Sequence, residues 1–466
     1  MTAPTSFPLT DARNDEMTGA SALRAPSEST NDHSRKMSSA SWVGIVAGAA
    51  AALTGVSLPG LPSTVNASLP VAALALVIAC LASPRGSMVR FRLRALDAFL
   101  LLYVTAIALV EYFDVTYSDA AFSLSTILNL VGVLAVYFAC RLVVTSANDG
   151  LRVLQGVFIA AIPVAVLGIA QMLGGRQVSE LLVRFTIAPG LQGRLDLGWP
   201  LRATSTLGHW TALGGYLAIA IAIGCYLIVE KSGSQLIPKP LVLGIGILFV
   251  AQVSTFTFAP ILVAIVTMLY TAVQVKIRFI GLLSLVSIGG AAFLLFDEQV
   301  GDRLTSQLSS PSKDGLPRWI PETIRYRVGI WNNETVPAVL DSPLFGHGAN
   351  VYNRISAGTA PSTLRWPSPE SEWMRTAVAS GVVLAVLEVA LLVYAVSKVW
   401  TTSDLPGVTS FRTIGIALVG ILVISSFHSH FSSGSVAMMF WMVVAVVLST
   451  QDSLTMSGKN NYGRVS

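Results

Sequence analysis

The sequence predicts an all-α membrane protein, a polytopic bundle of about 12 transmembrane helices with a large extracytoplasmic loop that contains short helices. Two observations predict this class. Of the 466 residues, 53% are hydrophobic and only 12% are charged, whereas a soluble domain carries about 25% charged residues. Apolar runs of about 20 residues, the length that crosses a bilayer as a helix, also recur along the chain.

The apolar runs divide the chain in order. Residues 1–40 are rich in Ser, Thr, Asp and Ala, which predicts a disordered cytoplasmic tail. We expect the further segments to be transmembrane helices 1–9 at 41–297 with an outer loop at 175–208, a large extracytoplasmic loop at 298–372, transmembrane helices 10–12 at 373–450, and a cytoplasmic tail at 451–466. The expected spans are 41–58, 69–84, 95–113, 122–144, 152–174, 209–230, 239–254, 258–275, 277–297, 373–399, 411–427 and 433–450. The seventh and eighth could form one broken hairpin, because Pro260 cannot continue a helix unassisted.

The positions of Lys and Arg predict the orientation. With the amino terminus inside, the loop between the second and third spans places four arginines in the cytoplasm, and the short outer loops carry no Lys or Arg. This is the positive-inside pattern. We therefore expect a multi-pass protein of the cytoplasmic (inner) membrane, with its active site on the extracytoplasmic side, where segments 175–208 and 298–372 lie.

Several other classes of site are disfavoured. Cys80, Cys140 and Cys225 each lie inside an apolar run, as buried small hydrophobes do, and form no disulfide or zinc pattern. The net charge of +5 reflects loop arginines, and no basic run indicates nucleic-acid binding. His428 and His430 have a spacing that metal ligands use, but no third ligand pattern accompanies them, so we interpret them as interfacial residues.

The two outer segments concentrate guanidinium groups, each of which can bind two phosphate oxygens at once. The arginines that carry this prediction are Arg194, Arg202, Arg325 and Arg327. Arg202 and His209 would share one face if this stretch were helical. The alternative is an arginine that snorkels to the interface and a histidine bonded to neighbouring backbone.

The second outer segment holds further candidate residues. We expect a helix from about 322 to 340, on which Arg327 and Trp331 are i,i+4 neighbours; Trp331 would stack on a sugar or pack at the membrane interface. The stretch from Asp341 to Asn350 reads as a turn that brings backbone near a ligand or a neighbouring span. His347 is interpreted there as a local hydrogen-bonding residue.

Glu370 and Glu372 lie where this loop meets the tenth span. Partial burial would raise the pKa of either carboxyl towards the working pH, as a general base requires. The alternative is that both serve as favourable N-terminal helix charge, with Ser368 or Ser371 as the cap. The sequence leaves open which glutamate points into a cavity.

These motifs, in this order, resemble those of the O-antigen ligase / O-antigen and exopolysaccharide polymerase superfamily of bacterial envelope proteins. Its members typically show Arg-x-x-Gly-Thr-Phe-x-His-Pro-Asn-x-x-Gly before a mid-chain span, and the stretch from Arg202 to Gly214 lines up with it. They also show Arg-x-x-x-Trp and then Pro-Leu-x-Gly-x-Gly, which Arg327 to Trp331 and residues 343–348 match. The resemblance covers residues 200–385 by motif and the whole chain by span pattern.

The chain departs from the family pattern at three places. In the first motif, the usual Gly, Pro and Asn are replaced by Ser205, Trp210 and Thr211. Where ligases carry a His-Asn pair, this chain has Glu370 and Ser371, followed in register by Gly381. The Ser-Arg motif often found in the eighth span is represented by residues 254–260 without an arginine, so one phosphate contact is missing or supplied by another residue.

The resemblance implies a membrane glycosyltransferase that uses a polyprenyl-diphosphate-linked saccharide donor, without a cofactor. We expect a polysaccharide polymerase that transfers the glycan to a lipid-linked acceptor repeat unit, metal-independent and inverting. A ligase that moves finished glycan to a lipid or protein acceptor is the alternative within the family. The implied partners are the donor, the glycan acceptor, membrane lipid, and a chain-length regulator or flippase, with no nucleic acid.

The resemblance also implies roles for residues. Arg202 and Arg327, with Arg325 or Arg194, would neutralise the departing diphosphate, and His209 and Trp331 would contribute to substrate binding. Glu370 or Glu372 would take the proton of the acceptor hydroxyl.

A transporter or flippase of lipid-linked saccharides is an alternative from another class, and an envelope sensor or assembly partner is a third. A transporter should carry charge within its spans and an internal repeat. We find little charge inside the expected spans apart from Glu388, and no obvious repeat.

Overall fold

The computed structural model describes residues 37–58, 65–83, 93–118, 124–232, 238–275, 320–355, 358–403 and 410–462 and the single residues 301, 305 and 317; for 114–118, 125 and 456–462 it describes the backbone alone. Within these residues every named element is helical, and the β-structure consists of two isolated bridges. The all-α prediction is confirmed. Ser38–Ser466 form one compact unit, which contains all the helices described below.

Eleven of the expected spans correspond to helices. They are α1 (Ser39–Ala52), α2 (Ser68–Ala82), α3 (Ala95–Ser118), α4 (Leu124–Val143), α5 (Ala147–Leu173), α8 (Trp210–Lys231), α9 (Lys239–Ser254), α10 (Phe258–Gln274), α16 (Glu372–Thr402), α17 (Phe411–Ser425) and α18 (Ser435–Tyr462). Six of these (α3, α4, α5, α8, α16 and α18) are long and apolar enough to cross a membrane, and the other five are shorter apolar helices. The expected span at 277–297 lies outside the described residues.

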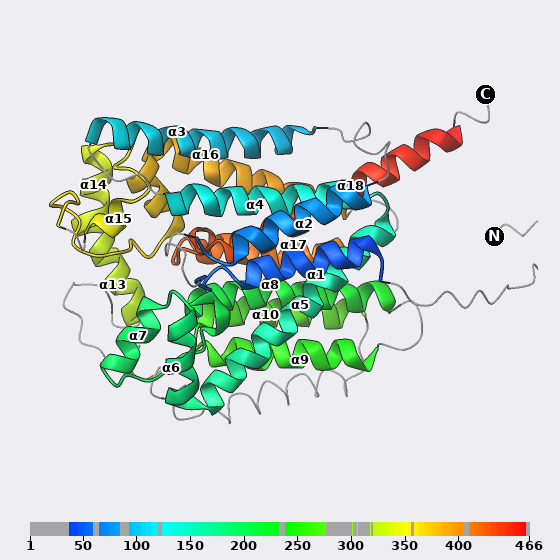
Figure 1. Cartoon of the computed structure of the whole chain (residues 1–466), viewed down its shortest axis with the longest axis horizontal. Helices are drawn as coiled ribbons and strands as arrows, with labels where there is room; N and C mark the ends of the chain where they lie inside the picture. The colour runs from blue at the N-terminus through cyan, green and yellow to red at the C-terminus, as the bar shows by residue number, and fades with distance from the viewer. Residues whose placement is uncertain are drawn as a thin grey trace, which may run out of the picture. The chain divides into compact units, whose positions relative to one another are not determined.

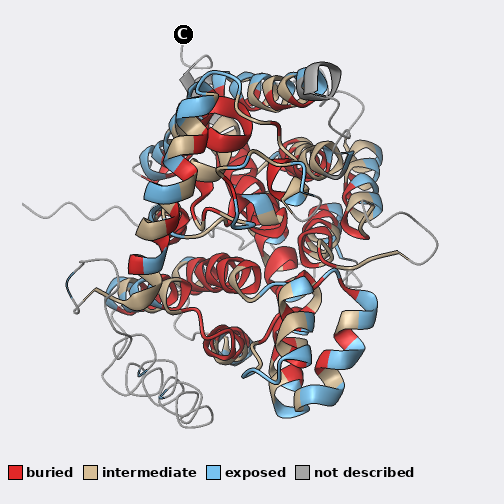
Figure 2. Ribbon diagram, turned by 90° about the vertical axis from the view of Figure 1, so that its left-hand side faces the viewer, coloured by how far each residue is buried: buried red, intermediate tan, exposed pale blue. Residues whose placement is uncertain are grey.

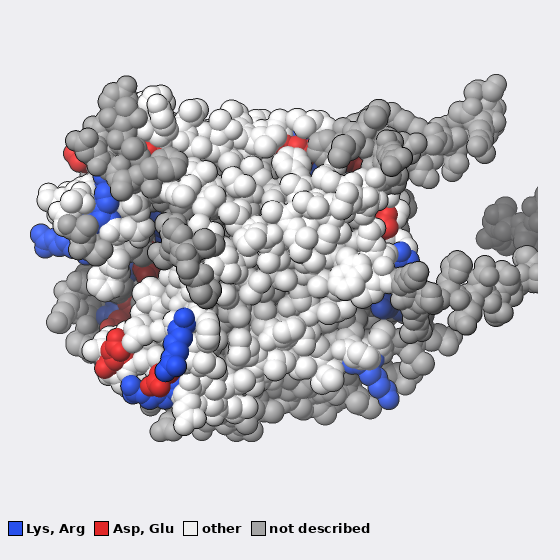
Figure 3. All heavy atoms as spheres, viewed as in Figure 1, with Lys and Arg blue, Asp and Glu red and all other residues white. Residues whose placement is uncertain are grey.

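The charged residues visible on one face of the molecule support the membrane interpretation. Figure 3 shows Lys, Arg, Asp and Glu at the two ends of the helical bundle, with a broad band of other residues between them. Buried residues lie on the inward sides of the helices and exposed ones on the outward sides (Figure 2). An uncharged band between two charged ends is what a bundle that crosses a bilayer requires.

Helix α8 lies at the centre of the bundle, and 94% of its most apolar 18-residue stretch is buried. It packs against α5, α9, α10, α17 and α18. Small residues allow close packing elsewhere, as in α1 against α5. A Cβ on Gly44 would lie 2.2 Å from the Val153 carbonyl oxygen, and one on Gly156 would lie 2.5 Å from the Ser41 carbonyl oxygen. Such glycine contacts let two membrane helices approach backbone to backbone.

The expectation of little charge inside the spans is wrong in part. Asp97 and Glu111 are fully buried in α3, and Arg141 is buried in α4. Arg141 pairs with Asp97 at 3.2 Å and with Asp452 at 3.0 Å. Asp452 belongs to α18, which continues past the expected end at residue 450. These pairs tie α3, α4 and α18 together at the end of the bundle away from the short helices (Figure 1).

The short helices gather at the other end of the bundle (Figure 1). They are α6 (Gly175–Phe185), α7 (Pro189–Asp196), η2 (Ser205–Leu207), α13 (Glu322–Ile330), the π-helical segment η3 (Trp331–Thr335), α14 (Val336–Asp341), α15 (Val351–Arg354) and η4 (Phe431–Ser433). The helix expected from about 322 to 340 is therefore observed as α13, η3 and α14, an unbroken run that ends at Asp341.

The turn expected after this run packs against a kink in α16. Gly381 has φ 85°, outside helical geometry, so the α16 ladder is interrupted there. The freed carbonyls of Val378 and Ala379 accept hydrogen bonds from the backbone N–H groups of His347 and Gly348, each at 2.8 Å. The prediction that this turn approaches a neighbouring span is confirmed, and His347 also bonds locally, to the carbonyl of residue 338 at 2.8 Å.

Helices α9 and α10 form the hairpin that the sequence allowed. Residues 255–257 separate them, with Phe256 in the left-handed region at φ 49°. Pro260 lies in the first turn of α10, where a missing N–H costs nothing. It packs close to Gly214 of α8, on which a Cβ would lie 3.3 Å from the proline ring.

Candidate functional site

A cavity of about 560 Å³ lies at the end of the bundle where the short helices gather. Its walls come from α7, the entrance to α8, the α9–α10 turn, α13, the loop before α16 and the loop after α17. The polar and charged residues among its lining are Arg194, Arg202, His209, Thr211, Thr257, Thr323, Tyr326, Arg327, Glu370 and His428. Arg202 and Arg327, far apart in the sequence, therefore share one cavity.

The first wall is organised around Trp210. The guanidinium carbons of Arg194 and Arg202 lie 4.8 and 5.1 Å from the Trp210 ring centroid, close enough for cation–π attraction to hold both. Arg194 also donates a hydrogen bond from Nη1 to the Pro200 carbonyl oxygen at 2.7 Å. His209 stacks on Trp210 at 4.3 Å between ring centroids. Thus the tryptophan that stands where the family usually has proline supports two cations and an imidazole.

The assumption that Arg202 and His209 lie on one helix is wrong. Residues 201–204 are not helical, and His209 is the N-cap of α8, where its imidazole accepts from the Thr211 N–H at 3.3 Å. The two side chains still meet in the cavity because the chain turns between them. Ser205 has φ 48° in this turn, a conformation that favours glycine, and it occupies the position where the family usually has glycine.

The second wall joins three residues from separate segments, Arg327 on α13 and Glu370 and His428 on two loops. Nη2 of Arg327 lies 3.5 Å from Oε2 of Glu370 and 3.4 Å from each ring nitrogen of His428. Oε2 of Glu370 lies 4.0 Å from Nδ1 of His428. Arg327 also donates from Nη1 to the carbonyl oxygen of Thr323 at 3.2 Å. A guanidinium, a carboxylate and an imidazole thus face the same space.

Burial and neighbouring charges set the protonation of this site. Desolvation raises the pKa of Glu370 above its ordinary value of 4.5, although Arg327 opposes the increase. Desolvation and the cation of Arg327 hold the pKa of His428 well below 6.5. Desolvation, with Arg202 and Arg194 nearby, lowers the pKa of His209 to about 4. Both histidines are therefore neutral near pH 7, and the arginines carry the positive charge.

The loop that carries Glu370 is held in an unusual conformation. Glu370 has φ 55°, which is strained for a residue with a side chain. Its N–H bonds to Oγ of Ser368 at 3.1 Å, and the carbonyl of the preceding Pro369 accepts from Nε1 of Trp331 at 2.6 Å. Trp331 also packs against Phe427. It does not line the cavity; it positions the backbone beside Glu370.

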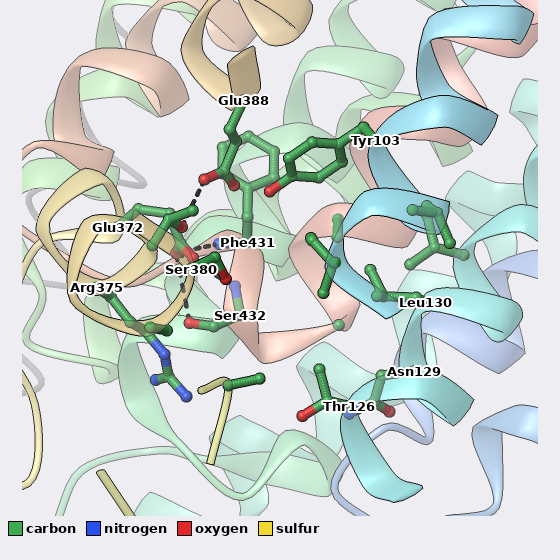
Figure 4. Close-up of a pocket in the computed structure, with 18 of the residues that line it drawn as sticks. Tyr103, Thr126, Asn129, Leu130, Glu372, Arg375, Ser380, Glu388, Phe431 and Ser432 are labelled. Atoms are coloured by element: carbon green, nitrogen blue, oxygen red, sulfur yellow. Dashed lines mark hydrogen bonds between the residues drawn. The ribbon is translucent and has the colours of Figure 1, made fainter. Parts of the chain in front are cut away.

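The structure separates the two glutamates. The Glu372 carboxylate accepts from the N–H groups of Phe431 at 2.8 Å and Ser432 at 3.2 Å, and it lines a second cavity (Figure 4). Ser371 occupies the N-cap position of α16 without a side-chain cap hydrogen bond, Ser368 bonds Glu370 instead, and Glu372 is the acidic residue of the first turn. Of the two candidate bases, Glu370 faces the arginines.

The structure places two other residues differently from what the sequence predicted. We call the cavity shared by Arg202 and Arg327 the arginine cavity. Arg325 is buried but is not among the residues that line it. His428, interpreted as interfacial, lines that cavity, while His430 is fully buried beside α8. The signal that could have indicated His428 was its place in a loop on the same side of the membrane as Arg327. Phe256 and Phe258 of the α9–α10 turn also line the cavity, within the stretch 254–260 that stands for the Ser-Arg motif of the family.

Comparison with known proteins bears on this site. Residues 240–388 match the family model described as O-antigen ligase. This part of the chain is similar to the O-antigen ligase family. The matched range spans the α9–α10 hairpin, Arg327, Glu370 and the kink of α16, whereas Arg202 and His428 reach the cavity from outside it. No curated protein matches the chain significantly.

The apolar helices and the similarity of residues 240–388 to the O-antigen ligase family together indicate a multi-pass membrane protein.

Proposed function

We propose that this chain is a polysaccharide polymerase that acts on the outer side of the cytoplasmic membrane. It transfers a glycan from a polyprenyl-diphosphate-linked donor to a lipid-linked acceptor repeat unit. The observation that carries the proposal is the single cavity shared by Arg194, Arg202, Arg327 and Glu370. Three guanidinium groups facing one carboxylate provide the charges that a departing diphosphate and an acceptor hydroxyl require.

The arginines act on the leaving group. As the bond between the anomeric carbon and the diphosphate oxygen breaks, the electron pair stays on the diphosphate, whose negative charge increases. Arg202 and Arg194, held against Trp210, approach it from one wall, and Arg327 approaches it from the other. Fixed guanidinium groups that need no rearrangement stabilise such charge most effectively. Arg194 supplies the cation that the eighth span lacks, since the neighbouring α9–α10 turn lines the cavity with aromatic and small residues.

Glu370 acts on the acceptor. Its carboxylate takes the proton of the acceptor hydroxyl as that oxygen bonds the anomeric carbon from the face opposite the diphosphate, which inverts the centre. Without donor, Arg327 contacts Glu370. When a bound diphosphate offsets the charge of Arg327, the cation lowers the pKa of Glu370 less, and Glu370 becomes a stronger base. Donor binding therefore activates the base.

His428 is the second group able to accept a proton. Its neutral imidazole lies beside both Arg327 and Glu370, so it can orient the carboxylate or hydrogen-bond a sugar hydroxyl. We assign it a positioning role, because desolvation and the adjacent guanidinium disfavour the protonated imidazole that a base would have to form.

A ligase is the second candidate, and the description of the matching family favours it. The two activities differ in the lipid-linked species that accumulates when the gene is deleted. A polymerase deletion accumulates single repeat units, and restoring the wild-type chain returns long polymer. Accumulation of full-length polymer on its lipid carrier would instead identify a ligase.

A further inference from the structure

A second cavity is lined by Glu372, which does not line the arginine cavity (Figure 4). Its volume is about 260 Å³, and it lies among α3, α4, α16 and η4. Unlike a helix interface, it is lined by many groups that hydrogen-bond. They are Tyr103, Thr126, Asn129, Asn353, Glu372, Arg375, Thr376, Ser380, Ser432 and Glu388. We call it the polar cavity.

The polar cavity is lined by groups suited to a polyhydroxylated ligand. The buried carboxylate of Glu388 accepts from Oγ1 of Thr376 at 2.6 Å, and Figure 4 shows the Tyr103 hydroxyl turned towards Glu388. Arg375 reaches the rim from the same helix as Glu388, while Asn129 lies across the cavity on α4. Carboxylates, hydroxyls and amides that bond one another can also bond sugar hydroxyls.

An apolar groove of about 770 Å³ adjoins the polar cavity. It lies between the outer half of α3 and α16, and the turn at 344–348 forms part of its wall. Ser380 lines both spaces, and Ile107 in the polar cavity follows Ala106 in the groove. The groove side chains Leu109, Phe113 and Val383 are about half exposed, so the groove opens sideways, where a bilayer would supply hydrocarbon.

Only a thin partition separates the polar cavity from the arginine cavity. Glu370 lines one and Glu372 lines the other. Likewise, His428 faces the arginines, while Phe431 and Ser432 face the polar cavity, and the Glu372 carboxylate joins these two strips of chain. Glu370 and Glu372 are two residues apart, and two residues of extended chain span about 7 Å. A saccharide hydroxyl that extends from the polar cavity past Glu372 therefore reaches Glu370.

We infer that the polar cavity and the apolar groove together form a second substrate site, which holds the acceptor as a lipid-linked saccharide. The saccharide lies among Asn129, Arg375 and Glu388, and the isoprenoid chain lies along α3 and Val383. This inference rests on the proposed function, in which the arginine cavity holds the donor. A site with one polar and one apolar end, adjoining the base, lets donor and acceptor enter from different sides.

The test uses the full chain in lipid nanodiscs and a photoreactive probe, a farnesyl-diphosphate-linked disaccharide with a diazirine on its last isoprene unit. Val383→Trp fills the groove; Val386→Trp, an exposed valine on the same helix that does not line the groove, is the matched control. We expect labelling within 106–113 and 383–384. Val383→Trp should reduce it about tenfold, the change that about 1.4 kcal/mol of binding energy produces, and Val386→Trp should leave it unchanged.

Four further arms make the outcome decisive. Arg375→Gln should weaken labelling, while Arg365→Ala, an exposed arginine outside both sites, should not. Unlabelled disaccharide lipid should displace the probe, and phosphatidylglycerol at the same concentration should not; equal displacement would identify an ordinary phospholipid contact and overturn the inference. Equal labelling of the two tryptophan variants would also overturn it. Labelling needs no turnover, so a wild-type chain that labels here but transfers no glycan contradicts the proposed function alone.

Discussion

Nη2 of Arg327 lies 3.5 Å from Oε2 of Glu370 in a cavity that Arg202 lines from the opposite wall. The contact joins the two sides of the proposed reaction, because Arg327 would stabilise the leaving diphosphate and Glu370 would activate the acceptor. In the proposed reaction, the cation favours the ionised carboxylate at the position where the family pattern has His-Asn. A bound diphosphate then offsets that positive charge, so Glu370 becomes a stronger base.

Glu370 and Glu372 should respond differently to the same substitution. Glu370→Gln keeps the shape but removes the base, so transfer should fall by roughly 10²–10⁴-fold while the protein remains in the membrane. Glu372→Gln should reduce transfer much less. It should lower the stability of the protein, because the Glu372 carboxylate accepts hydrogen bonds from the backbone N–H groups of Phe431 and Ser432. The measurement is polymer formation in membranes with matched protein amounts. Equal loss in both variants would reject the assignment of Glu370 as the base.

The pH dependence of transfer should carry the signature of Glu370. The reaction needs the ionised carboxylate, and burial raises the pKa of Glu370 above 4.5, so activity should fall as the pH decreases through that raised pKa. His209 and His430 do not produce this limb, because their pKa values of about 4 and about 3 lie below it. Glu370→Gln should abolish the limb in the residual activity. An unchanged profile in that variant would assign the limb to another group.

Trp331→Phe should lower the rate of transfer and change the stability of the protein little. The change removes the hydrogen bond to the Pro369 carbonyl, which holds the strained backbone at Glu370, while most of the ring packing against Phe427 remains. We expect roughly a tenfold lower rate with little change in donor KM, since about 1.4 kcal/mol of lost positioning has that effect. Trp366→Phe, a change at an exposed tryptophan of the same loop, is the control. Similar losses in both variants would remove the positioning role.

Gly381→Ala should damage the fold at the kink of α16. Gly381 has φ 85°, and an added Cβ would lie 2.1 Å from the Leu344 carbonyl oxygen. Strain of this kind costs on the order of 1–3 kcal/mol before any clash is relieved, so the thermal midpoint in detergent should fall. Gly329→Ala in α13 meets no atom within 4 Å and should be neutral or slightly stabilising. A stable Gly381→Ala protein would contradict the observed packing of the turn.

Local signals predicted much of the fold. Span positions follow from hydrophobic length, so eleven helices lie close to where the sequence places them. The helix at 322–341 and the approach of residues 343–348 to α16 also follow from glycine, proline and helix periodicity. The buried charges of Asp97, Glu111 and Arg141 were missed, because their partners lie on other helices.

For the site, the sequence predicted only which residues lie on the same side of the membrane. Arg202, Arg327 and Glu370 were expected on one side of the membrane, and they line one cavity. The choice between Glu370 and Glu372 required the structure, because the loop places Glu370 in the arginine cavity and Glu372 in the polar cavity. His428 was misinterpreted because His-x-His spacing says nothing about a guanidinium that arrives from α13.

The central claim is that Arg202 and Arg327 together stabilise a lipid-borne diphosphate. The most direct measurement compares Arg202→Ala, Arg327→Ala and the control Arg365→Ala for glycan transfer from a polyprenyl-diphosphate-linked repeat unit, at equal protein in the membrane. Loss of one fixed donor to the developing charge should lower the rate by roughly 10²–10³-fold, so both cavity variants should lose long polymer and the control should keep it. Long polymer made at the wild-type rate by either cavity variant would contradict the account.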